Sequence, residues 1–240
     1  MLRPSELNRL QHLEDDLALL PVGWGNEGKG PMLSAWQNHA GFTVDQLHAV
    51  DGMRSVGART GVLTGPLAAF DFDGETSLEL ELYPWEFITW HVHRDNDPFR
   101  LKVLCRPTPE QIAMLPQQSD GTVEFQGKTI TAPKRGDIKG EALEVFFFGG
   151  RQVIVLGEHP STGGNYFWPD GLGPEALCVP PDDWWAHAVT IAQKEAAKAV
   201  SGSRPSKTRN GTRRLDPCPI CGRHSGKGGS ALCSHSTCVC

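Results

Sequence analysis

The chain has 240 residues, a length that corresponds to one or two domains. Hydrophobic residues make up 39% of it and charged residues 21%, which is typical of a globular protein and excludes a wholly disordered one. It contains no apolar run near the ~18 residues of a membrane span, and its first twenty residues lack the basic-then-apolar order of a signal peptide. We therefore expect a cytoplasmic protein with no membrane partner.

The net charge of -5 conceals an uneven distribution. Residues 1–190 contain 14 Lys and Arg against 26 Asp and Glu, a net of -12, whereas residues 191–240 contain 9 against 2, a net of +7. An acidic body with a basic tail is one charge pattern of nucleic-acid enzymes. The acidic body by itself argues against non-specific DNA binding by that part of the chain.

The predicted elements begin with a helix over residues 4–20. Five leucines recur there at spacings of three and four and form one apolar stripe, and Ser5 is the expected cap. A second, short helix is expected directly after Thr43, whose hydroxyl is a favourable N-cap.

Strand patterns begin at Arg59. Short apolar runs bounded by glycine occupy residues 61–65 and 67–74, and alternating patterns predict a pair of strands at 87–93 and 99–105.

The second half of the body is predicted to mix helices with a hairpin. A short helix is expected after Thr108, followed by a polar loop or hairpin over residues 117–142. The apolar runs 142–148 and 151–157 are separated by Gly149-Gly150, which predicts a β-hairpin. A helix over residues 182–200 closes the body.

Three parts are therefore expected along the chain. The body spans residues 1–190, a basic linker spans 191–216, and a zinc-binding segment spans 217–240. From Ser201 the linker consists mainly of Gly, Ser, Pro, Lys and Arg with almost no apolar residue, a composition that predicts flexibility.

Two aspartates follow the apolar run at residues 67–70. On a strand, Asp71 and Asp73 point to the same face while Phe72 points to the other. Two carboxylates so close together repel each other unless a cation lies between them, and Mg²⁺ and Mn²⁺ prefer such oxygen ligands. The alternative is a polar strand end with an Asp-Gly turn.

Glu144 lies within an apolar strand, where a lone carboxylate is costly. A third metal ligand beside Asp71 and Asp73 explains it. The alternative places Glu144 on the solvent face of an edge strand, paired with a cation.

A group of cations and imidazoles occupies the predicted strand pair. It comprises His91, His93, Arg94, Arg100 and Lys102. A metal site that handles a nucleotide needs such groups to hold the triphosphate, although a solvated hairpin face is the alternative. His159, on a loop after a strand, adds another imidazole, and its alternative is simple exposure.

Five of the seven cysteines lie in the last 23 residues. Such clustering in a cytosolic chain indicates metal ligation rather than disulfides. Tetrahedral Zn²⁺ takes four sulfur or nitrogen ligands, and the candidates are Cys218, Cys221, Cys233, His235, Cys238 and Cys240.

Together these motifs resemble the N-terminal primase-polymerase domain of the archaeo-eukaryotic primase superfamily, above all its phage and plasmid branch. The resemblance covers roughly residues 15–170. It rests on PVGWGNEGKGPMLSAWQ, on GARTGVLTGPLAAFDFDG with the metal-binding pair, and on LEVFFFGGRQVIVLGEHPSTGGNYFW with the third acidic residue. The basic linker and cysteine cluster are similar to the segment that joins such primases to helicases.

The resemblance implies an α/β fold, with an RNA-recognition-motif-like core sheet packed on a smaller N-terminal α/β part. It implies a DNA primase and DNA polymerase of phage or plasmid replication, in the host cytoplasm if phage-encoded. Two Mg²⁺ or Mn²⁺ ions on Asp71, Asp73 and Glu144 would serve nucleotidyl transfer. The partners are a single-stranded DNA template, nucleoside triphosphates and a helicase. Nucleotide contacts are expected from Arg59, Thr64, Gly65, His91, His93, Arg94, Arg100, Lys102 and His159.

The sequence departs from the family pattern in two places. The family has a histidine in a glycine-rich strand between the two acidic motifs, whereas residues 89–104 contain no glycine. Either His91 or His93 supplies that imidazole, or the neighbouring Arg and Lys side chains bind the phosphates instead. Gly157 and Glu158 replace the proline and serine that precede the family's loop histidine.

Two other functions use the same residues. One is a metal-dependent nuclease, but the lysine that such sites place shortly after the second acidic residue has no counterpart after Glu144. The other is a non-catalytic replication module that binds DNA through its zinc tail.

Overall fold

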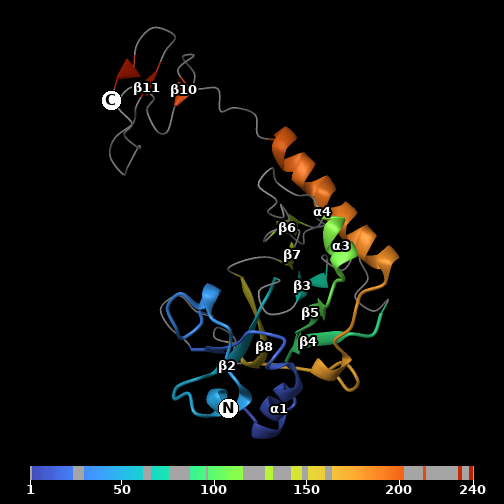
Figure 1. Ribbon diagram of the computed structural model, residues 1–240. Coiled ribbons are helices and arrows are strands. Elements are labelled where there is room, and N and C mark those ends of the chain that lie inside the picture. The colour runs from blue at the N-terminus through green and yellow to red at the C-terminus, as the bar shows by residue number, and fades with distance from the viewer. Residues whose placement is uncertain are drawn as a thin grey trace. The chain divides into compact units, whose positions relative to one another are not determined.

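The computed structural model describes residues 2–23, 30–61, 66–75, 87–95, 97–115, 128–131, 142–147, 151–159 and 164–202, and three two-residue strands in the tail. The chain divides into two compact units, Met1–Lys194 and Glu195–Cys240. Figure 1 labels most of their helices and strands.

The first unit is built on a mixed α/β arrangement dominated by one antiparallel sheet. Its described strands are β1 (Leu19–Val22), β2 (Ser55–Arg59), β3 (Ala68–Asp73), β4 (Trp90–Arg94), β5 (Asp97–Cys105), β6 (Lys128–Thr131), β7 (Ala142–Phe146), β8 (Gln152–Glu158) and β9 (Asn165–Phe167). They are ordered β1-β2-β8-β9-β4-β5-β3-β7-β6. The helices are α1 (Pro4–Asn8), α2 (Val44–His48), α3 (Pro109–Ala113) and α4 (Asp182–Gly202), with short 3₁₀ turns at Gln11–Leu13, Trp36–Asn38 and Pro174–Ala176.

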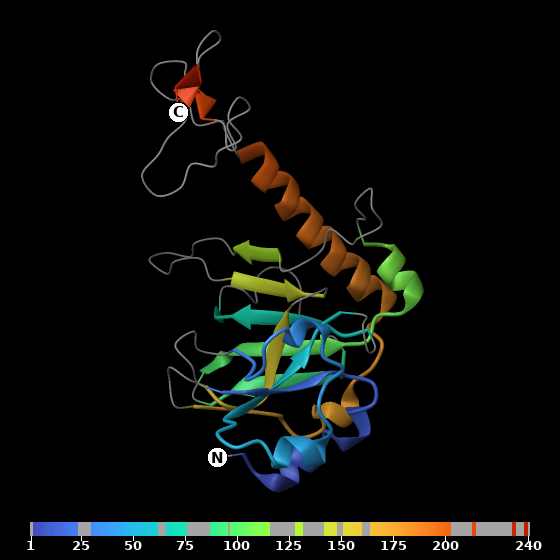
Figure 2. The same cartoon turned by 60° about the vertical axis from the view of Figure 1, so that its left-hand side comes forward.

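In the centre of the sheet the strands do not follow chain order, because β5 lies between β4 and β3, and β3 lies between β5 and β7. Figure 2 shows β3, β5 and β7 side by side. β5 pairs antiparallel with both β3 and β4, so those two strands run in the same direction with β5 between them. β3 likewise pairs antiparallel with β5 and β7 and separates them.

The two faces of this part of the sheet contribute to two different cores. One core contains Trp90 and Val92 of β4 together with the N-terminal leucines and residues of β2 and β8. The other contains Phe70 and Phe72 of β3 with Trp184 and Trp185 of α4. The Phe70 and Trp184 rings meet edge to face with centroids 4.9 Å apart. α4 is also fixed to α3, beside which it lies in Figure 2, because Trp185 Nε1 donates to the Gln111 carbonyl at 2.8 Å.

The predicted helix over residues 4–20 is wrong in its extent. Residues 4–8 form α1 and residues 11–13 a 3₁₀ turn, whereas Leu19–Val22 form β1, which pairs with β2. The leucine stripe is nevertheless buried, so a broken helical segment satisfies the same apolar pattern and frees residues 19–22 for the sheet. The N-cap is Arg3, without a side-chain cap bond, and not Ser5.

The predicted hairpin across Gly149-Gly150 is also wrong. β7 pairs with β3 and β6, whereas β8 pairs with β2 and β9, so the two strands lie in different parts of the sheet. The local turn signal is overridden by long-range strand pairing. In the region expected to be a loop or hairpin, residues 128–131 form β6, which pairs antiparallel with β7, and residues 117–127 and 132–141 lie outside the described residues.

Several local predictions are confirmed. Thr43 and Thr108 each cap a short helix through a capping box with a glutamine. β4 and β5 form the expected strand pair, and α4 covers the expected final helix. Most of the predicted strand at residues 61–65 lies outside the described residues.

The second unit contains three described strands, β10 (Arg213–Arg214), β11 (Leu232–Cys233) and β12 (Cys238–Val239), in that order. Cys233 and Cys238 are cross-strand partners. The other predicted zinc ligands, Cys218, Cys221, His235 and Cys240, lie outside the described residues. In the part of the chain that the structure describes, no helix combines the length and apolar character needed to cross a membrane.

Gly157 of β8 provides a test of this arrangement. Its φ is +105°, and a Cβ added there would lie 2.4 Å from the Arg54 carbonyl oxygen and 2.6 Å from the Ser55 Cα, both backbone atoms. Because neither can move aside and the conformation is strained for alanine, we expect Gly157→Ala to cost on the order of 3 kcal/mol of unfolding free energy.

The matched control is Gly171→Ala. Gly171 has a φ of +75° but no atom within 4 Å of an added Cβ. We therefore expect Gly171→Ala to lower the unfolding free energy by only about 1 kcal/mol. Chemical denaturation of the two variants compares them, and equal losses would contradict the close packing of β8 on β2.

Candidate functional site

Strand register brings the predicted carboxylates together. Asp71 of β3 lies directly opposite Glu144 of β7 on one side and Lys102 of β5 on the other. Asp73 lies opposite Arg100. Opposed residues of antiparallel strands share a face of the sheet, so three acids and two cations gather on one face.

These side chains line one pocket of about 140 Å³. Its walls come from β3, β4, β5 and β7, and from residues at or beside β8 and β9. The lining residues are Asp71, Asp73, Arg94, Arg100, Lys102, Glu144, His159 and Tyr166.

Lys102 is the central cation of this pocket. Its Nζ lies 3.0 Å from Asp71 Oδ1, and the two side chains are 10% and 15% exposed. Nζ also lies over the Tyr166 ring, 4.8 Å from its centroid. Burial lowers the pKa of Lys102, but Asp71, Tyr166 and Asp73 outweigh this and raise the pKa above its ordinary value. Lys102 therefore stays protonated beside the acids.

His159 is buried in the pocket wall and is not an exposed loop residue. Its Nε2 lies 3.4 Å from Arg94 Nη1, and its ring centroid is 5.7 Å from that of Tyr166. The backbone N–H of His159 donates to the Gly164 carbonyl at 2.7 Å. The imidazole is thereby held next to the Arg94 guanidinium.

The structure does not bring His91 and His93 to the carboxylates. They lie opposite Val103 and Leu101, residues of the core that packs on α4, and so face away from Asp71. Their rings stack on each other with centroids 6.0 Å apart. Burial, followed by the charge of His93, lowers the pKa of His91 to about 4, and burial lowers that of His93.

Arg59 is also placed away from the pocket lining. It is buried, and its Nη1 donates to the carbonyls of Gln37 and His39 at 2.7 and 2.6 Å. Burial lowers its pKa. Its contacts fasten β2 to the segment after residue 36. Thr64 and Gly65 lie outside the described residues.

Sequence reasoning assigned no role to Tyr166, which lines the pocket, or to Asp97, which contacts two of the lining arginines. Tyr166 lay within the resemblance but carried no expected contact. Asp97 Oδ2 accepts a hydrogen bond from Arg94 Nη2 and lies 3.0 Å from Arg100 Nε. The signal that could have identified Asp97 is its spacing of three residues from each arginine at the β4–β5 turn.

The donor set is suitable for a hard divalent cation. Asp71, Asp73 and Glu144 supply carboxylate oxygens from adjacent strands, the ligand type that Mg²⁺ and Mn²⁺ prefer. Asp71 and Asp73 are held by Lys102 and Arg100, at 3.0 and 2.7 Å. Within the described ranges, no group of three or more His, Cys, Asp and Glu side chains is already gathered around a metal position. In this structure Asp71 and Asp73 are therefore engaged by cationic side chains.

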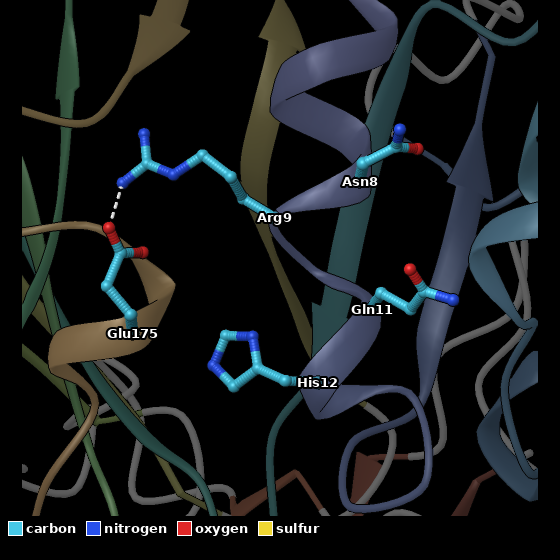
Figure 3. Close-up of a pocket in the computed structure, with 5 residues that line it drawn as sticks. All are labelled: Asn8, Arg9, Gln11, His12 and Glu175. Carbon is cyan, nitrogen blue, oxygen red and sulfur yellow. Dashed lines mark hydrogen bonds and ion pairs between the residues drawn. The ribbon is translucent and has the colours of Figure 1, made fainter.

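A second hollow lies elsewhere on the first unit. It is lined by Asn8, Arg9, Gln11, His12 and Glu175, and Figure 3 shows Arg9 directed at Glu175, with which it forms an ion pair. The Arg9 guanidinium also lies 4.9 Å from the Trp168 ring centroid. These contacts tie the N-terminal segment to the 3₁₀ turn at Pro174–Ala176, and the hollow contains a single acid.

Comparison of the chain with protein-family models, curated proteins and solved structures found no match. The candidate site therefore rests on the geometry of this chain's own residues.

The placement of His91 predicts a pH dependence. Because its pKa in the folded state is about 4 against an ordinary 6.5, the unfolded chain takes up the proton first as the pH falls. The stabilisation by neutral His91 is complete above pH 6.5 and is lost between pH 6.5 and 4, by about 3 kcal/mol in total. His91→Gln should remove that part of the acid sensitivity.

Urea unfolding at several pH values between 4 and 7.5 measures this effect. His12→Gln, at an exposed position, is the control and should follow the wild type. If His91→Gln lost stability with falling pH as steeply as the wild type, His91 would not be buried on the α4 side.

Proposed function

We propose that this protein is a template-dependent nucleotidyltransferase, a DNA primase and polymerase that acts in replication. The observation that carries the proposal is the single pocket in which Asp71, Asp73 and Glu144 face Arg94, Arg100, Lys102 and His159. Such a combination of acids and bases suits a reaction that joins a hydroxyl to a triphosphate.

The acids are the proposed ligands of two Mg²⁺ or Mn²⁺ ions. When bound, such ions lower the pKa of the attacking 3′-hydroxyl and stabilise charge on the leaving pyrophosphate. Asp71 and Asp73 hold the ions from one strand and Glu144 from the neighbouring strand. Their positions are set by backbone pairing, so the donors are held on adjacent rigid strands.

The bases are the proposed contacts of the triphosphate. Arg94 and Arg100 present planar guanidinium groups that match phosphate oxygens in pairs, and Lys102 supplies a point charge. A cation released from Asp71 or Asp73 becomes available to the phosphates. The site thus exchanges internal ion pairs for contacts with the ligand.

The strand order supports the finer fold assignment, a core sheet like that of the RNA-recognition motif. β3 and β4 run in the same direction with the antiparallel β5 between them. β5 and β7 likewise run in the same direction with β3 between them. Two interleaved units of this kind characterise split β-α-β folds, and α3 lies in the connection between β5 and β7. The N-terminal strands β1 and β2, with β8, represent the smaller part.

The basic tail is the proposed template-binding part. Its Lys and Arg residues suit the phosphates of single-stranded DNA, with an affinity that falls as salt rises. We propose that its cysteines and His235 bind one Zn²⁺ and that the tail lies next to a helicase domain or partner. Metal analysis of the purified protein tests the zinc site, and a zinc content near zero in protein purified without chelator would reject it.

The direct test is nucleotide incorporation on single-stranded DNA with Mg²⁺ or Mn²⁺, with and without a primer. We expect Asp71→Asn/Asp73→Asn to lower incorporation by more than about 100-fold, the size of effect produced by removing one group that stabilises transition-state charge. Glu144→Gln should cause a comparable loss. Asparagine keeps the shape of the side chains, and thermal melting verifies that each variant is folded.

The matched control is Asp51→Asn/Asp170→Asn, which removes the same charge at two exposed positions and should retain wild-type incorporation. Degradation of DNA without added nucleotides would favour a nuclease. DNA binding with no activity, unchanged in the Asp71→Asn/Asp73→Asn variant, would favour a non-catalytic module.

A further inference from the structure

We propose that Asp97 is a positioning residue that holds Arg94 and Arg100 together as a two-pronged receptor for the polyphosphate of the incoming nucleotide. This inference rests on the proposed function, because it assigns a ligand group to one side of the same pocket. Asp97 itself is not among the residues that line the pocket. It acts through the two arginines that do.

One carboxylate oxygen makes both contacts. Asp97 Oδ2 accepts from Arg94 Nη2 and lies 3.0 Å from Arg100 Nε. Arg100 in turn reaches Asp73 Oδ1 through Nη1 at 2.7 Å. The side chains become more exposed along this chain of contacts, from 13% for Arg94 to 29% for Asp97 and 38% for Arg100.

The β4–β5 turn creates the arrangement. Arg94 of β4 and Asp97 of β5 are cross-strand partners and form the last pair before the turn. The register of the two strands shifts between His93 and Arg94. Arg100 follows Asp97 by three residues on β5. Alternation along β4 already places Arg94 on the opposite face from His93, and the shift pairs it with Asp97 where an unbroken register would pair it with Arg100. On its other side Arg94 pairs with Tyr166 of β9.

Two guanidinium groups side by side repel each other and carry long, flexible side chains. Each loses conformational entropy when a ligand fixes it, and an anchor already present removes part of that cost. Asp97 neutralises one of the two charges and holds both groups. Each guanidinium has five N–H donors, more than these contacts use, so donors are available to phosphate oxygens.

Asp97 also gives Arg100 a second anchor. Arg100 contacts Asp73 through one nitrogen and Asp97 through another. If Asp73 turns to a metal ion, the contact with Asp97 is the one that keeps Arg100 at the pocket. The two aspartates therefore have separate roles, with Asp73 on the metal side and Asp97 on the phosphate side.

The sign of the mutational effect separates positioning from simple electrostatics. Asp97 is an acid close to a site for a polyanion, so a purely electrostatic effect predicts that Asp97→Asn tightens binding. If Asp97 instead anchors the two arginines, Asp97→Asn should weaken binding of the polyanion. We expect Asp97→Asn to weaken binding of inorganic tripolyphosphate by about 10-fold, and Asp97→Glu, which keeps the charge, to restore most of the affinity.

The experiment measures tripolyphosphate binding by calorimetry and nucleotide incorporation by the full chain. In the incorporation assay Asp97→Asn should raise the nucleotide KM by about 10-fold and leave kcat within twofold, because Asp97 touches no proposed metal ligand directly. Asp95→Asn is the matched control on the same turn. Asp95 Oδ2 accepts hydrogen bonds from Asn165 at 3.2 Å and is not in contact with either arginine in the described contacts.

The outcomes distinguish this inference from the proposed function. Weaker tripolyphosphate binding by Asp97→Asn, without nucleotide incorporation by the wild type, would support the anion receptor and reject the polymerase. Incorporation with an unchanged or lower KM in Asp97→Asn would reject the role of Asp97 and leave the polymerase standing. A wild type that neither binds tripolyphosphate nor incorporates nucleotides would overturn both, and equal losses in Asp95→Asn and Asp97→Asn would reject the specific role of Asp97.

Discussion

The ion pair between Lys102 and Asp71 is the contact around which the site is organised. Both side chains are largely buried, so each charge needs the other, and neither is easily replaced alone. The pair spans the register between β3 and β5, and the same register sets Arg100 against Asp73. Slipping the strands by one residue would turn the acids into the core and Phe70 and Phe72 into the pocket. Stability of the sheet and assembly of the site thus depend on the same alignment.

The alternation along β3 explains how one strand serves two purposes. Phe70 and Phe72 fill the core against α4, while Asp71 and Asp73 face the pocket. The flanking strands follow the same rule, with Val103 in the core and Lys102 in the pocket. Along β3 the aromatic side chains on one face anchor the strand in the core, and the acids on the other face are left for the polar chemistry of the pocket. The acids are thereby held by a well-packed scaffold, although they repel one another.

Strand periodicity predicted much of this site and failed where long-range pairing decides the outcome. Alternation correctly placed Asp71 with Asp73 on one face of β3 and Arg100 with Lys102 on one face of β5, and the strand register joins these into a single face. It also placed His91 with His93, but it cannot determine which face of the sheet such a pair occupies, and the structure puts them on the α4 side. The same limitation applies to β7 and β8, whose glycines suggested a local hairpin, and to β1, which was hidden in a leucine stripe of helical spacing. Asp97 escaped notice because its role depends on the β4–β5 register shift.

We propose that the acids of this face exchange their internal cations for a divalent metal ion. Titration of the metal-free protein with Mn²⁺, followed by electron paramagnetic resonance of the free ion, measures this directly. We expect saturable Mn²⁺ binding that is lost in Asp71→Asn/Asp73→Asn and retained in Asp51→Asn/Asp170→Asn. Binding that is equal in the wild type and the Asp71→Asn/Asp73→Asn variant, or absent from both, would contradict it.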